Sequence, residues 1–122
     1  MKTYENFINN NNPKIEYYSN GQKELEEWSL NGKRHREDGP AYQWWYENGQ
    51  KEFEIWYLND KYHREDGPAV KWWYLNGKKS NEQWFLNDKE YTREEWVEKL
   101  KEIDSPHYDE QKMLLNVDKY NI

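Results

Sequence analysis

The chain contains one heptapeptide twice, first as His35-Arg36-Glu37-Asp38-Gly39-Pro40-Ala41 and again, 28 positions later, as His63-Arg64-Glu65-Asp66-Gly67-Pro68-Ala69. The same shift relates three segments that open on tryptophan: Trp28-Ser29-Leu30-Asn31, Trp56-Tyr57-Leu58-Asn59 and Trp84-Phe85-Leu86-Asn87. Self-similarity at a fixed period is typical of repeat architectures, in which each copy is one supersecondary unit. We therefore expect three copies of a repeat within residues 14–91.

Two kinds of turn alternate along each period. Asn-Gly between aromatic segments is a strong hairpin signal and occurs at Asn20-Gly21, Asn31-Gly32, Asn48-Gly49 and Asn76-Gly77. Asn59-Asp60 and Asn87-Asp88 stand at positions equivalent to Asn31-Gly32, and both residue types tolerate a left-handed backbone. The Glu-Asp-Gly-Pro segments predict wider turns, because proline cannot donate to a sheet ladder. The pattern predicts a mainly β fold, an antiparallel meander of about three 28-residue, two-strand repeats with one hairpin per repeat.

The segments on either side of the repeats differ from them. Residues 1–13 include a run of four asparagines and are expected to form a flexible or loop-like segment. Residues 92–122 predict a helical C-terminal cap of one or two helices, since Thr92 and Glu95 have the spacing of a capping box. Residues 14–91 would then be the β-hairpin array of a single α+β domain. We expect these side chains of the cap to face inward: Trp96, Leu100, Ile103, Tyr108, Met113, Leu114 and Val117.

The composition restricts the classes of function. Aromatic residues make up 18% of the 122 residues, against a mean hydropathy of −1.53, so we expect a core built from aromatic side chains. Cysteine is absent, which excludes disulfides, thiolate zinc sites and cysteine nucleophiles. The net charge of −6 argues against direct binding of nucleic acid. No run of 18 apolar residues and no apolar N-terminal stretch is present, so we expect no membrane contact and a cytoplasmic protein, in the host cytoplasm if the source is viral.

Strand parity divides the repeated side chains into two groups. The residues that keep their identity are expected to be structural: Trp28, Trp56, Trp84, Leu30, Leu58 and Leu86, with Gly39 and Gly67 in the wide turns. The varying positions between them are expected to face solvent or a partner. Trp44 and Trp72 stand where the first copy has Glu16, which predicts an exposed aromatic pair. Because Trp, Tyr and Arg dominate interface hot spots, the expected partner-binding residues are Trp44, Trp72, Tyr57, Phe85, Arg36 and Arg64.

The repeated His-Arg-Glu-Asp segments admit a chemical and a structural interpretation. His35 or His63 could act as a general base beside the acidic residues, or those acids could bind a hard cation. An active site is normally assembled once from dissimilar elements, whereas this segment occurs twice at equivalent positions. We therefore expect Asp to accept backbone donors in the turn, Arg and Glu to pair across strands, and His to pack on an aromatic ring. No catalytic residue, metal ligand or cofactor is expected, and the chain is not expected to be an enzyme.

The second heptapeptide and the segment before it, Trp56-Tyr57-Leu58-Asn59-Asp60-Lys61-Tyr62, resemble the His-Arg-Glu-Asp-Gly-Pro-Ala repeat proteins of phages, giant viruses and AT-rich bacteria. These are similar to variant MORN repeats with their Tyr-Tyr-x-Asn-Gly hairpins. The resemblance covers about residues 14–96 and implies a β-hairpin array that acts as a binding platform, with no catalytic residue to carry over. Variant MORN repeats also occur in bacterial toxin-neutralising proteins, and small acidic phage proteins include anti-CRISPRs that cover the nucleic-acid channel of an effector.

These observations favour a non-enzymatic protein-interaction module of viral or mobile-element type. Its specific form would be a counter-defence inhibitor, similar to an anti-CRISPR, that binds a host nuclease effector. The alternatives are a toxin-neutralising protein similar to an antitoxin, a hydrolase or metal-dependent enzyme that uses His35 and His63, and capture of a glycan or nucleotide by the aromatic sheet. A protein partner is expected, either a host effector or a toxin, and an uncovered sheet edge at the N-terminal hairpin would allow a homodimer.

Overall fold

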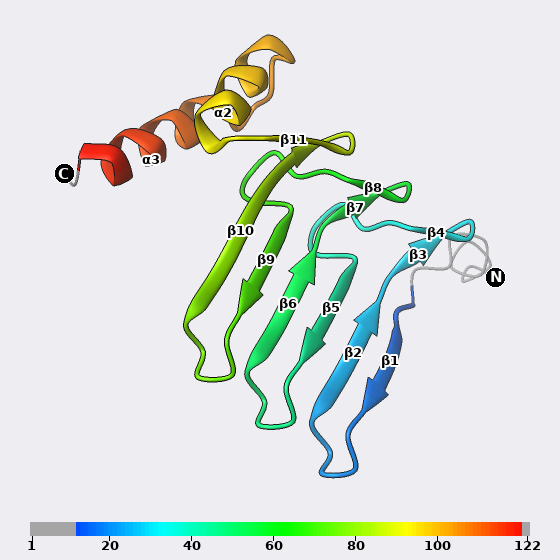
Figure 1. Cartoon of the computed structure of the whole chain (residues 1–122). Helices are drawn as coiled ribbons and strands as arrows, with labels where there is room; N and C mark the ends of the chain where they lie inside the picture. Colours follow the sequence, from blue (N-terminus) through cyan, green and yellow to red (C-terminus); the bar gives the residue numbers. More distant parts are fainter. Residues whose placement is uncertain (1–11, 121–122) are drawn as a thin grey trace.

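The computed structural model describes residues 12–120, which form a mainly β fold with a helical C-terminal part (Figure 1). A seven-stranded sheet has the order β1-β2-β5-β6-β9-β10-β11, so its strands are neighbours in space in the order in which they occur in the chain. All of its pairings are antiparallel. Its strands are β1 (Lys14–Tyr17), β2 (Lys23–Glu27), β5 (Tyr42–Trp45), β6 (Lys51–Ile55), β9 (Val70–Trp73), β10 (Lys79–Leu86) and β11 (Lys89–Tyr91). The structure confirms the predicted antiparallel meander with a helical cap.

Neighbouring repeats join in the same register each time. Leu25 of β2 lies opposite Trp44 of β5, and 28 residues later Phe53 of β6 lies opposite Trp72 of β9. Each long hairpin also contains one register shift, at which an extra residue increases the local twist of the sheet. The surface through which one repeat binds the next is therefore used twice within this chain.

Each of the first two repeats has a short second hairpin, built on the predicted turns at Asn31-Gly32 and Asn59-Asp60. β3 (Ser29–Leu30) pairs with β4 (Lys33–Arg34), and β7 (Tyr57–Leu58) pairs with β8 (Lys61–Tyr62). Their tight turns contain residues with positive φ, 53° at Asn31 and 49° at Asn59, which asparagine tolerates better than most residues. The strand after each turn is only two residues long, because the chain then enters the heptapeptide.

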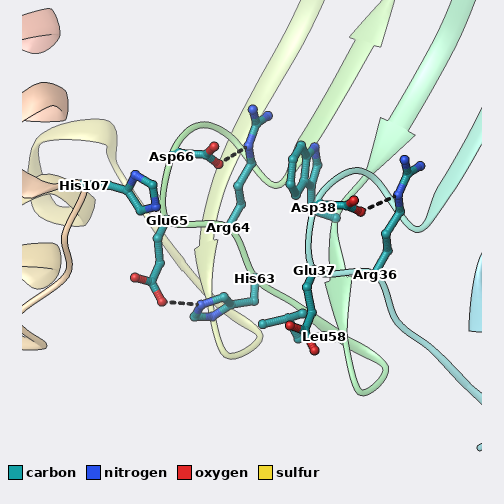
Figure 2. A pocket seen from close by; sticks show the side chains of 10 residues that line it. Arg36, Glu37, Asp38, Leu58, His63, Arg64, Glu65, Asp66 and His107 are labelled. Carbon is teal, nitrogen blue, oxygen red and sulfur yellow. Dashed lines mark hydrogen bonds and ion pairs between the residues drawn. The ribbon is translucent and has the colours of Figure 1, made fainter. Parts of the chain in front are cut away.

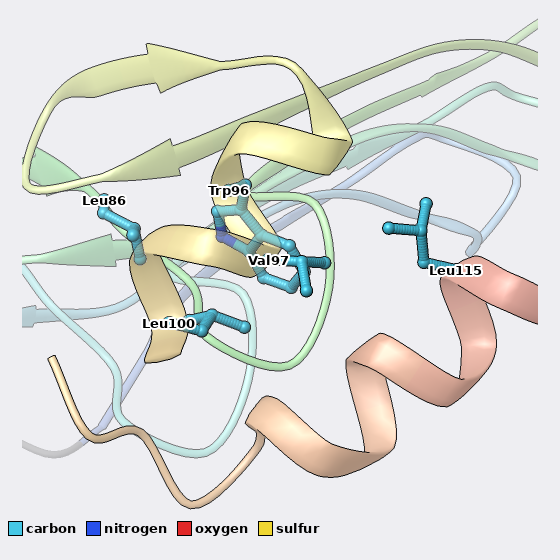
Figure 3. Close-up of a cluster of buried hydrophobic side chains, with 5 residues drawn as sticks. All are labelled: Leu86, Trp96, Val97, Leu100 and Leu115. Atoms are coloured by element: carbon cyan, nitrogen blue, oxygen red, sulfur yellow. The ribbon is translucent and has the colours of Figure 1, made fainter. Parts of the chain in front are cut away.

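The helical cap consists of α2 (Arg93–Glu102) and α3 (Tyr108–Tyr120), which lie beyond one end of the sheet, next to β10 and β11 (Figure 1). The capping box is confirmed: the Thr92 side chain accepts from the backbone N–H of Glu95, and the Glu95 carboxylate accepts from the backbone N–H of Thr92. Side chains from β10, α2 and α3 form a buried cluster (Figure 3), which consists of Leu86, Trp96, Val97, Leu100 and Leu115.

Several inward-facing side chains of the cap were predicted wrongly. Trp96 and Leu100 are fully buried as expected, but Ile103, Met113, Leu114 and Val117 are all exposed. The residues of α3 that are buried are instead Gln111 and Leu115. α3 packs on α2 rather than on the face of a sheet, so only a narrow stripe of the helix is covered.

Strand parity also assigned two side chains to the wrong environment. Tyr57 and Phe85, which were expected to face solvent or a partner, each retain only 8% of their accessible surface. Phe85 packs with Ala69 and Val70 in a second buried cluster, and the ring of Tyr62 lies between those of Tyr57 and Phe85, 5.1 and 4.8 Å from their centroids. The short hairpins cover this side of the strands, and a two-residue periodicity cannot show which side a distant hairpin will cover.

The expected loop-like N-terminal segment falls mainly on residues 1–11, which lie outside the described part of the chain. Asn12 and Pro13 have no regular secondary structure, and β1 begins at Lys14. Between residues 12 and 120, neither helix has the length and apolar character needed to cross a membrane.

Candidate functional site

The arginine of each heptapeptide is held inside its own loop, and we call residues 35–41 and 63–69 the heptapeptide loops. The guanidinium carbon of Arg64 lies 3.9 Å from the ring centroid of Trp56. Its Nη1 donates to the carbonyl of Pro68 (3.1 Å) and its Nε to Asp66 (2.9 Å; Figure 2). Arg36 makes the same contacts in the first loop, with Trp28, Pro40 and Asp38. Asp66 thus accepts from a side chain and not from the backbone donors that the sequence suggested.

The glycine of each loop leaves room for this guanidinium. A Cβ atom built on Gly67 would lie 2.7 Å from Cζ of Arg64, and one on Gly39 would lie 2.7 Å from Cζ of Arg36. Neither glycine has a positive φ. The requirement for glycine is therefore steric: the backbone forms one side of a slot whose other side is the tryptophan ring.

The histidine of each loop holds the next repeat in place. Nδ1 of His35 accepts from the backbone N–H of Asn59 (3.1 Å), and Nδ1 of His63 accepts from that of Asn87 (3.1 Å). Because Nδ1 is an acceptor, the proton of the neutral ring is on Nε2, which in His63 lies 2.9 Å from Glu65. Each histidine thus accepts from a backbone donor of the next repeat, a role that the sequence did not predict.

An aspartate of each later repeat binds the backbone of the repeat before it. Asp60 accepts from the backbone N–H of Arg34 with its side chain (2.7 Å) and donates its own N–H to the carbonyl of Arg34 (2.9 Å). Asp88 makes the same pair of bonds to Tyr62 (2.8 and 2.9 Å). The first copy has Gly32 at this position. Only the second and third copies have a preceding repeat to bind, and only they have Asp in place of Gly. This difference between copies was the sequence signal for the contact.

A concavity of about 280 Å³ lies between the two heptapeptide loops (Figure 2). His107, immediately before α3, enters it beside Glu65 (Figure 2). Burial by itself raises the pKa of Glu65, but the hydrogen bonds from His63 and Ser105 and the nearby imidazoles of His63 and His107 outweigh it, so the pKa is lowered. Within residues 12–120, no group of three or more His, Asp or Glu side chains is arranged to hold a metal ion.

Glu26 is a second internal carboxylate, and only 8% of the residue is accessible. It accepts from the indole N–H of Trp28 (2.7 Å), from Lys23 (2.9 Å) and from the amide of Gln43 (3.1 Å). Burial alone raises its pKa, but these hydrogen bonds outweigh burial and lower the pKa below its usual value. Glu26 therefore serves as an acceptor at the junction between β2 and β5.

Trp44 and Trp72 lie on the same face of the sheet, with Phe53 between them. The ring centroid of Phe53 is 6.1 Å from that of Trp44 and 4.7 Å from that of Trp72, and Tyr42 lies 5.8 Å from Phe53. We call Trp44, Phe53 and Trp72 the aromatic row. No helix of residues 12–120 covers this face (Figure 1), and Trp72 is 37% exposed.

The six residues expected to bind a partner therefore separate into three groups. Trp44 and Trp72 are together in the aromatic row, whereas Tyr57 and Phe85 are buried and Arg36 and Arg64 are occupied within the heptapeptide loops. Sequence reasoning missed Phe53, which lies opposite both Trp44 and Trp72. Its place follows from the register between β5, β6 and β9, which is not visible in the repeat alone.

The opposite face carries a different pattern of alternating tryptophan and lysine. Lys51 Nζ lies 5.7 and 5.9 Å from the ring centroids of Trp45 and Trp73, and Lys23 lies 5.1 Å from Trp45. Lys23 and Lys51 are also paired with glutamates three residues on, at 2.9 and 3.8 Å. This face is thus occupied by internal cation–π and ionic contacts.

Comparison with protein-family models, with curated proteins and with solved structures finds no match to the chain.

Proposed function

We propose that this protein is a non-enzymatic protein-interaction module whose contact surface is the aromatic row. The observation that carries the proposal is a contiguous set of three large aromatic side chains on a sheet face that no helix of the described chain covers. Aromatic residues bury large areas with few rotatable bonds, which is why they dominate the energetics of interfaces.

The contacts of the heptapeptide loops support this choice over a hydrolase. Each histidine already binds a backbone N–H of the next repeat, and each arginine is enclosed by a tryptophan ring and a glycine. A general base needs a free nitrogen within hydrogen-bond distance of a substrate proton. The repeated polar residues have structural roles that account for their repetition.

The proposal is tested by comparing variants of the two faces. Trp44→Ala combined with Trp72→Ala truncates the row, and Trp45→Ala combined with Trp73→Ala truncates the adjacent residues that face the other way. Tagged proteins would be used to capture partners from a bacterial lysate, with thermal unfolding as a check on folding. We expect the first pair to lose at least about tenfold in capture of a specific partner, since hot-spot truncations cost about 2 kcal/mol or more. Equal capture by both folded variants would remove the row as the contact surface.

The partner class that we propose is a host nuclease effector, which makes the protein a counter-defence inhibitor. The net charge of −6 supports this form, because a basic nucleic-acid channel attracts an acidic protein. A DNA-cleavage assay with purified CRISPR effectors and excess protein tests it, and cleavage that continues at the uninhibited rate would contradict it. The toxin-neutralising alternative predicts instead that co-expression rescues growth of cells that produce a toxin.

A further inference from the structure

The outer edge of β10 is only partly covered. β11 pairs with Trp84–Leu86, whereas residues 79–83 pair with β9 on one side and have no strand on the other within residues 12–120. Inside the chain, the equivalent edges of β2 and β6 bind β5 and β9. The edge of β10 is thus the third copy of a surface whose first two copies each bind a strand.

The backbone groups of this edge are directed outward. Trp28 and Trp56 donate their N–H groups across the two internal junctions to Ala41 and Ala69, both at 2.7 Å. Alternate residues of a strand direct their backbone groups to the same side. Glu82, two residues before the third tryptophan, therefore directs its N–H and carbonyl toward the open side.

Two side chains that join successive repeats have no such acceptor in the last repeat within residues 12–120. The hydroxyl of Tyr18 donates to the carbonyl of Trp45 (2.7 Å), and that of Tyr46 donates to Trp73 (2.8 Å). Tyr74 is the next in the series and is 59% exposed, and the position that would receive it, Lys101, belongs to α2.

The amide side chains repeat the same arrangement. Asn20 and Asn48 donate to the carbonyls of Glu47 and Leu75, at 3.0 and 3.3 Å. Asn76 is the third member of this series, and its equivalent acceptor, Ile103, is the C-cap of α2.

The strand that would fit this edge is β1 of a second copy. β1 occupies the same place in its repeat as β5 and β9, so it carries the backbone spacing that β2 and β6 bind. In the internal register, Asn81 would lie opposite Glu16, Glu82 opposite Ile15, and Gln83 opposite Lys14 of the second copy.

The charges at the two surfaces are complementary. The groove beside the open edge has a volume of about 490 Å³ and is lined in part by Glu82, Glu90 and Glu95. Lys14 would enter it from the second copy, and its side chain is 63% exposed. At the other end of the junction Lys79, 55% exposed, would lie over Tyr17 of the second copy, as Lys23 lies over Trp45.

We propose that the protein self-associates head to tail, with β1 of one copy added to the open edge of β10 in the next, in the register of the internal repeats. The interface is heterologous, so it generates open chains unless its rotation closes a ring. Asn81 and Gln83 stand where β6 has Phe53 and Ile55. Because these residues are polar, the monomer tolerates this edge exposed to water, and the association depends on protein concentration.

Cysteine cross-linking tests the register directly, since the natural chain has no cysteine. Asn81→Cys and Glu16→Cys would be made in separate proteins and mixed under mild oxidation. Residues opposite each other in an antiparallel pair are about 4.5–5.5 Å apart at Cα, which a disulfide can bridge. We expect a disulfide-linked heterodimer to form faster than with Gln83→Cys and Glu16→Cys, which are diagonal. An equal rate for both mixtures would overturn the register.

Sedimentation of the unmodified protein tests the association itself. The mass should rise from 15.3 kDa in dilute solution by about twofold or more when concentrated. Glu82→Pro removes a donor that faces the open side, so it should hold the protein at the monomer mass, whereas Glu82→Ala should not. A mass that stays at 15.3 kDa at every concentration would overturn the proposal whatever the variants do. Absence of self-association would not affect the proposal that the aromatic row is the contact surface, because none of these residues belongs to the row.

Discussion

Replacing Gly67 with alanine should displace the Arg64 side chain from its slot. The added Cβ would lie 2.7 Å from the guanidinium carbon, and that end of the side chain is the part that can move. Displacement would break the contact with Trp56 at 3.9 Å and the hydrogen bond to the carbonyl of Pro68 at 3.1 Å. Gly67 has no positive φ, so the alanine backbone itself is not strained.

The magnitude follows from these contacts. The cation–π contact of a partly buried arginine is worth about 1 kcal/mol, and a hydrogen bond from a charged donor is worth about 1.5–3 kcal/mol. Against this, replacing glycine by alanine at an unstrained position stabilises by about 0.4–1 kcal/mol through the unfolded chain. The exposed pair with Asp66 adds little. We expect Gly67→Ala to lower the free energy of unfolding by about 2 kcal/mol.

A double-mutant cycle measured by urea unfolding, with tryptophan fluorescence as the signal, isolates the cause. In an Arg64→Ala background there is no guanidinium to displace, so Gly67→Ala should be neutral or slightly stabilising, within about 0.5 kcal/mol. Gly39→Ala with Arg36→Ala repeats the cycle in the first loop. If Gly67→Ala costs the same with and without Arg64, the steric account of the repeated spacing between arginine and glycine is wrong.

Three further outcomes are expected. Tyr46→Phe removes the hydroxyl that donates to Trp73 and should cost about 1 kcal/mol in thermal unfolding, whereas Tyr74→Phe, measured in dilute solution, should cost nothing; equal costs would contradict the assigned bond. Met113→Glu should leave the melting temperature unchanged, because the side chain is 57% exposed, and a large drop would place that face of α3 in a contact. The pKa of Glu26 is lowered in the folded state, so its ionised form contributes stability above its ordinary pKa of 4.5, and this contribution is lost as the pH falls through the folded-state pKa. Glu26→Gln should therefore flatten the acid side of a curve of unfolding free energy against pH. An unchanged slope would refute this.

Much of the architecture could be predicted because its signals are local. Asn-Gly and Asn-Asp turns need positive φ, which few other residues accept, and the structure places Asn31 and Asn59 in that region. The capping box at Thr92 depends only on residues three apart along the chain. Comparison of equivalent positions predicted an exposed pair at Trp44 and Trp72; Trp72 is exposed, whereas Trp44 is partly covered.

By itself, the sequence determined the period, the turns, the start of the cap and the equivalence of Trp44 and Trp72. Only the tertiary structure decided which sides of the strands are covered: Phe85 is buried beside Tyr62 of the preceding hairpin, and Tyr57 beside Tyr62 and Arg34. It likewise decided that His35 binds a backbone N–H in the next repeat. The physical reason is common to both: parity states that neighbouring side chains point to opposite sides, but burial and hydrogen bonding depend on which distant segment packs there.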